Sequence, residues 1–60
     1  MTELQLTQIR NYLLERKLPL DILLEVQDHF VSQINDLQKE ENLSFDEALT
    51  KTKNSWQNEL

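Results

Sequence analysis

The stretch PLDILLEVQDHFVSQINDLQKEE, residues 19–41, decides the fold of this chain. Its apolar residues recur at intervals of three and four, which is the spacing of one face of an α-helix at about 100° per residue. The inward positions are Leu20, Leu23, Leu24, Val26, Gln27, Phe30, Val31, Ile34 and Leu37. They cover close to half of the helix circumference, a face wide enough to contact two neighbouring helices. We therefore predict a long central helix over about residues 19–41, with Pro19 at its first position.

A shorter helix over about residues 3–17 precedes the central one. Thr2 and Gln5 have the spacing of a capping box, in which each residue binds a backbone N–H of the other at a helix start. Leu6, Ile9 and Leu13 then form an inward stripe. The helix must end before residue 18, because the residue ahead of a proline is pushed out of the α region.

A third helix is expected over about residues 45–59, running on toward Leu60 without a stop signal. Asn42 tolerates the left-handed conformation that ends many helices, and Ser44 with Glu47 forms a second capping box. The inward stripe of this helix is Phe45, Ala48, Leu49, Thr52 and Trp56. The expected fold is thus a single all-α, three-helix domain over residues 1–60.

The composition supports an all-α fold but a thin core. The chain has 60 residues, no glycine and no cysteine. Glycine-dependent hairpin turns and disulfides are therefore excluded. A domain of this size buries only about 60% of the surface that its unfolded chain exposes. We expect the fold to be completed by a protein partner, either through dimerisation or through an adjacent domain.

The charge narrows the class of partner. Eleven acidic and six basic residues give a net charge of -5, which repels nucleic acid and anionic lipid. The longest run of strongly apolar residues is Ile22-Leu23-Leu24, far short of the roughly 20 residues that cross a bilayer. We therefore expect no nucleic-acid binding and no direct membrane insertion by these residues.

Catalytic and metal-ligating patterns are absent from the sequence. Glu25 and His29 lie four residues apart and could form an ion pair, but zinc requires at least three protein ligands. Asp28 lies at the edge of the apolar face, where either solvation or a structural hydrogen bond is open to it. We predict no enzyme activity and no cofactor, and retain Asp28 and His29 as a candidate polar site, including a pH or metal sensor.

Four apolar residues are candidates for contact with a partner. Leu4, Leu14 and Ile22 fall outside the inward stripes. Trp56 lies on the last turn of the third helix, where core packing and partner contact are equally open to it.

The order of motifs resembles a family of bacterial helical modules. The motifs are Tyr12-Leu13-Leu14-Glu15, Leu18-Pro19, Leu23-Leu24-Glu25-Val26-Gln27-Asp28-His29-Phe30 and Leu43-Ser44-Phe45-Asp46-Glu47-Ala48-Leu49. This order is similar to that of the HAAS-type and permease-prefix domains, which usually have glycine where this chain has Asn42. The resemblance implies a cytoplasmic N-terminal domain of an integral membrane protein, cut before its first spanning segment and tethered by it to the inner membrane.

These features predict a non-enzymatic interaction or regulatory module. The alternative is a free-standing small acidic regulator that binds a basic protein surface.

Overall fold

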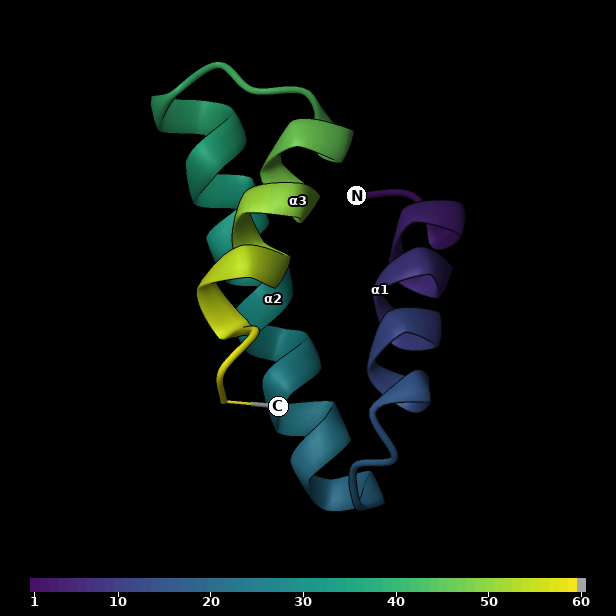
Figure 1. Ribbon diagram of the computed structural model, residues 1–60. Helices are drawn as coiled ribbons and strands as arrows, with labels where there is room; N and C mark the ends of the chain where they lie inside the picture. Colours follow the sequence, from purple (N-terminus) through teal and green to yellow (C-terminus); the bar gives the residue numbers. More distant parts are fainter. Residues whose placement is uncertain (60) are drawn as a thin grey trace.

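Three α-helices make up the fold in the computed structural model, which describes residues 1–59 (Figure 1). They are α1 (Glu3–Glu15), α2 (Leu20–Glu40) and α3 (Phe45–Trp56). No strand occurs in these 59 residues. The predicted all-α, three-helix fold is confirmed.

The capping box predicted at the start of α1 is formed. The Gln5 N–H donates to Thr2 Oγ1 at 3.2 Å, and the Thr2 N–H donates to Gln5 Oε1 at 3.1 Å. The helix ends at Glu15, two residues earlier than predicted, because Lys17 has a left-handed φ of 56°. This reversal lets the chain turn back toward α2 within four residues.

Pro19 was predicted to be the first residue of the central helix, but it lies just before α2 begins. It is the N-cap, with extended φ and ψ of -56° and 150°, and Leu20 is the first helical residue. The Pro19 carbonyl accepts the first helical hydrogen bond, from the Leu23 N–H at 2.8 Å. Asn42, with φ of 57°, takes the predicted left-handed conformation just after α2 ends.

The second capping box also forms, between Ser44 and Glu47 at the start of α3. The predicted end of α3 at residue 59 is wrong, because the helix stops at Trp56. Residues 57–59 form turns, in which the Glu59 N–H donates to the Trp56 carbonyl at 2.9 Å. None of the three is apolar, so further helix would bury nothing in the core. Leu60 lies outside the described residues.

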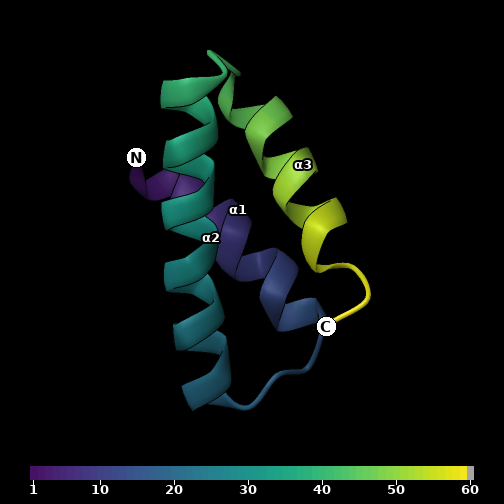
Figure 2. The ribbon, with the colours of Figure 1, turned by 90° about the vertical axis from the view of Figure 1, so that its left-hand side faces the viewer.

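The long helix α2 packs against both of the others, and Figure 2 shows it at one side of the molecule with α3 at the other. The core consists of Ile9 and Leu13 from α1, Leu23, Val26, Phe30 and Ile34 from α2, and Phe45, Ala48 and Leu49 from α3. The Thr52 side chain is fully buried beside them. Its hydroxyl donates to the Ala48 carbonyl at 2.8 Å, so this buried polar group is satisfied.

Two residues predicted to face the core, Leu20 and Leu24, are exposed. Their exposed fractions are 72% and 49%. The predicted apolar face is wider than the surface that the neighbouring helices cover at the start of α2. Leu23, one position before Leu24, is buried. Only part of the predicted apolar face therefore packs into the core at the start of α2.

The left-handed conformation at Asn42 gives a test of the α2–α3 turn. An Asn42→Ala variant should lose about 1 kcal/mol of unfolding free energy, because a Cβ carbon without a helpful polar group disfavours this conformation. Asn42→Gly should match or exceed the stability of the parent chain, because glycine adopts it freely. Urea unfolding followed by circular dichroism measures both variants. Equal stabilities of the alanine and glycine variants would contradict the left-handed turn.

Candidate functional site

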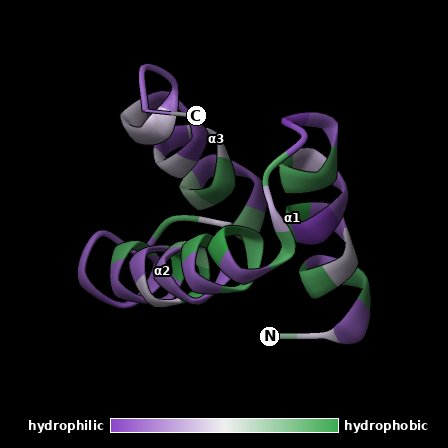
Figure 3. Ribbon diagram, turned by 90° about the horizontal axis from the view of Figure 1, so that it is seen from below, coloured by the Kyte–Doolittle hydropathy of each residue, from purple (hydrophilic) through white to green (hydrophobic). Residues whose placement is uncertain are grey.

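Four of the six exposed large hydrophobic residues in the described part of the chain lie at one end of the molecule. Within the described residues, the large hydrophobic side chains that are exposed belong to Met1, Leu4, Leu14, Leu20, Ile22 and Leu24. The last four lie at the end of α1 and the start of α2, on either side of the turn at residues 16–19. We call these four, Leu14, Leu20, Ile22 and Leu24, the hairpin tip. Figure 3 looks onto this end of the molecule and shows hydrophobic residues along the near part of α2.

The side chains of the hairpin tip surround the first turns of α2. Leu20 and Leu24 are four residues apart and are therefore neighbours on one side of the helix. Ile22 lies on another side, because each residue advances about 100° around the axis. Leu23 turns inward and is buried, and Leu14 follows the buried Leu13 on α1. Exposed apolar residues thus lie on both sides of the buried Leu23 at the start of α2.

A mismatch in helix length explains the exposure of Ile22, which lies on the same side of α2 as Gln33, where α3 packs. Leu20 and Leu24 are exposed because they lie on the other side of α2, away from α3. At 1.5 Å per residue, the 21 residues of α2 span about 31 Å, whereas the 12 residues of α3 span about 18 Å. The last residue of α3, Trp56, lies beside Phe30 and Gln33. The first part of α2 therefore extends past the end of α3, as Figure 1 shows.

Trp56, a predicted contact candidate, packs at the edge of the core. It is half-buried, and its ring centroid lies 5.7 Å from that of Phe30. Its indole N–H donates to Gln33 Oε1 at 3.2 Å. Both the ring and its polar atom thus have partners within the fold. Leu4, another candidate, is 69% exposed but lies near the opposite end of α1 from the hairpin tip.

Asp28 and His29 are both exposed on α2. The imidazole of His29 lies against Trp56, with ring centroids 6.0 Å apart and ring planes inclined by 34°. Within residues 1–59 a salt bridge joins Lys51 to Glu41 at 2.9 Å, and no salt bridge joins Glu25 to His29. The ion pair that the i, i+4 spacing allowed is therefore not formed, and the imidazole contacts α3 instead.

Two cationic side chains, those of Arg16 and Lys53, contact Tyr12, and this cluster was not predicted from the sequence. Arg16 Nη2 donates to the Tyr12 hydroxyl at 3.0 Å, and Lys53 Nζ lies 4.7 Å from the centre of the tyrosine ring. Since Lys53 comes from α3, the cluster links α1 to α3 by a cation–π contact. The i, i+4 spacing of Tyr12 and Arg16 could have indicated the first contact. Nothing in the sequence indicated the second.

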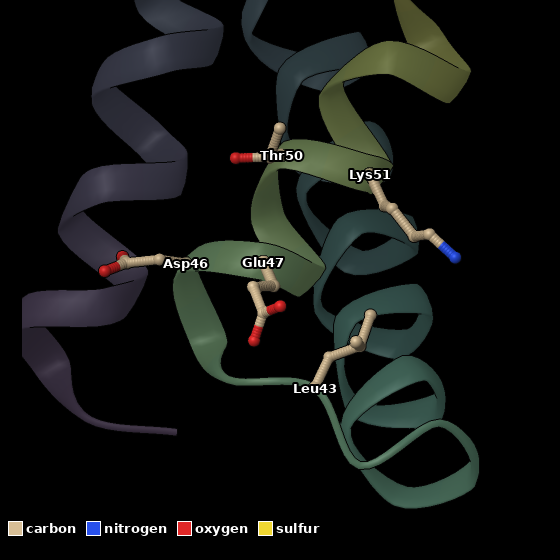
Figure 4. A pocket seen from close by; sticks show the side chains of 5 residues that line it. All are labelled: Leu43, Asp46, Glu47, Thr50 and Lys51. Atoms are coloured by element: carbon tan, nitrogen blue, oxygen red, sulfur yellow. The ribbon is translucent and has the colours of Figure 1, made fainter.

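A groove of about 370 Å³ lies beside the turn between α2 and α3. Figure 4 shows Leu43, Asp46, Glu47, Thr50 and Lys51 along it, with Asp46 and Lys51 pointing in opposite directions. Glu47 accepts a hydrogen bond from the Ser44 N–H at 3.2 Å, and Lys51 pairs with Glu41. These two charged groups thus serve the local fold.

Comparison of the chain with family models, with curated proteins and with solved structures finds no match in any of the three. No helix in the described part of the chain is long and apolar enough to cross a bilayer. The same residues contain no group of three or more histidine, cysteine or acidic side chains placed to hold a metal ion.

The contact between His29 and Trp56 can be tested by fluorescence, because the chain has one histidine and one tryptophan. In His29→Ala the emission maximum of Trp56 should move to longer wavelength, because loss of the imidazole ring exposes more of the half-buried indole to water. Glu25→Ala, one turn earlier on α2, is the matched control and should leave the emission unchanged. An emission maximum in His29→Ala equal to that of the parent chain would contradict the contact between the two rings.

Proposed function

We propose that this protein is a non-enzymatic helical interaction module whose hairpin tip binds a protein partner. The observation that carries the proposal is the presence of four exposed large hydrophobic residues between positions 14 and 24. Leu20 and Leu24 are neighbours on one side of α2, and adjacent exposed apolar side chains on a small soluble domain are typical of an interaction site. Among the contact residues predicted from the sequence, Leu14 and Ile22 belong to this surface, and Leu20 and Leu24 join them.

The other two predicted contacts have different roles in this proposal. Trp56 supports the site indirectly, because it fixes the end of α3 against Phe30 and so leaves Ile22 at the start of α2 uncovered. Leu4 lies away from the hairpin tip and serves as a reference position for experiments.

The setting that we propose is the cytoplasmic side of a bacterial inner membrane, as the N-terminal domain of an integral membrane protein. Its support is the resemblance in motif order to the HAAS-type and permease-prefix domains. The net charge of -5 agrees with this setting, because a negative charge disfavours adhesion of the domain to anionic lipid. The same charge also favours the alternative, a small acidic regulator that binds a basic protein surface. The gene distinguishes the two settings, since the first requires about 20 apolar codons downstream.

Site-specific photo-crosslinking in the cells that express the protein tests the interaction surface. A photoreactive phenylalanine analogue in place of Leu24 should crosslink to a protein, because this position lies within the proposed contact. The matched control carries the same analogue in place of Asp36, which is exposed on a polar side of α2. Equal crosslinking at both positions, or none at position 24, would overturn the proposed surface.

A further inference from the structure

We infer that the partner at the hairpin tip presents a basic amphipathic helix, which lays apolar residues on Leu20 and Leu24 and sets lysine or arginine side chains against the acidic residues beside them. This inference rests on the proposed function, since it gives the chemistry of the partner that the hairpin tip binds. Two features of α2 lead to it: the row of carboxylates beside its exposed leucines, and the absence of basic residues along most of the helix.

The carboxylates beside the leucines belong to Asp21, Glu25 and Asp28, which we call the acidic row. They recur at intervals of four and three residues, so they follow one side of α2. At about 100° per residue, Asp28 lies about 40° around the helix from Leu24, and Asp21 about 60°. All three side chains are exposed, and within residues 1–59 none of them forms a salt bridge. The acidic row therefore faces solvent directly beside the leucines.

No lysine or arginine neutralises the acidic row from its own helix. Between residues 18 and 38 the sequence has four acidic residues and no lysine or arginine. Lys17, with its left-handed φ of 56°, lies in the turn ahead of α2 and not on the helix. The first half of α2 is therefore a negative surface with an apolar edge.

The sign of this surface selects the class of partner. Nucleic acid and anionic lipid are repelled by it. A second copy of the chain would bring its own acidic row to the contact, because the row lies beside the same leucines. A basic protein surface instead forms pairs of opposite sign, which select the partner and speed its encounter.

The spacing of the two rows favours a helix as the basic element. Leu20 and Leu24 are one turn apart, and successive members of the acidic row are also about one turn apart. An amphipathic helix presents apolar residues and a basic edge at this same spacing, as in helix-in-groove recognition. On the other side of the leucines α1 borders α2, since Arg10 Nε donates to Gln27 Oε1 at 3.3 Å. The proposed helix thus lies along α2, between α1 and the acidic row.

Two synthetic peptides test this chemistry on the purified protein. Each has about 18 residues, enough to form a helix, with leucine at every third and fourth position. The remaining positions combine alanine with lysine in one peptide and alanine with glutamate in the other. In an NMR titration the lysine peptide should shift the methyl signals of Leu20 and Leu24, and the glutamate peptide should not. Equal binding of the two peptides, or binding of neither, would overturn the inference.

Substitutions then separate the acidic row from net charge. Asp28→Asn should weaken binding of the lysine peptide about threefold, as expected for one exposed ion pair. The matched control is Asp36→Asn, which removes the same charge from an exposed position outside the row and should leave the affinity unchanged. Equal weakening by the two variants would show a response to net charge alone and would overturn the role of the row.

The apolar half of the contact has its own matched pair. Leu20→Ala should weaken binding of the lysine peptide about tenfold, because it removes apolar area from the contact. Leu4→Ala should have no effect, although its leucine is 69% exposed against 72% for Leu20. Circular dichroism verifies that the variants keep their helices. Equal affinities of the two variants would contradict the leucine contact.

The proposed function and this inference fail in different ways in cells. With the photoreactive analogue at position 24, Asp28→Lys should remove most of the crosslinking, and Asp36→Lys should not. Crosslinking that survives Asp28→Lys unchanged would leave the interaction surface in place and overturn the basic partner. If position 24 crosslinks no more than position 36, the interaction surface itself is wrong, and this inference falls with it.

Discussion

Phe30 holds the three helices together. Its fully buried ring lies 6.0 Å from the ring of Tyr12 on α1 and 5.7 Å from that of Trp56 on α3, measured between centroids. Each aromatic pair contributes stability beyond the area that it buries. Because α2 packs against both α1 and α3, one side chain in its middle can contact both. Polar contacts at the rim then fix the outer helices: Arg16 and Lys53 on Tyr12, and Gln33 on Trp56.

The position of this aromatic contact determines what remains exposed. Trp56 contacts α2 near its middle, so α3 covers only the second half of the longer helix. Leu23 and Val26 are buried near the start of α2, whereas Leu20, Ile22 and Leu24 are exposed. Ile22 is exposed because α3 stops before it, and Leu20 and Leu24 are exposed because they lie on the side of α2 away from α3.

Local signals in the sequence predicted the helices better than their contacts. The two capping boxes and the left-handed Asn42 depend on residues within one turn of each other, and all three appear as predicted. The extent of the buried face on α2 depends on which sides of this helix α1 and α3 cover, and no nearby residue signals that. The same limit explains why Leu20 and Leu24 were predicted to face the core and why the contact between Lys53 and Tyr12 was not predicted. The exposure of the hairpin tip likewise follows from the arrangement of the helices in space.

The central claim is that the surface of a protein partner covers the start of α2. Methyl NMR of the leucine side chains, recorded on the purified protein and in the cells that express it, tests this claim most directly, because each methyl reports its own surroundings. The account predicts that the Leu20 and Leu24 methyl resonances shift or broaden in cells relative to the purified protein, while those of exposed Leu4 and buried Leu49 stay fixed. Resonances of Leu20 and Leu24 that do not move, or that move no more than those of Leu4, would contradict it.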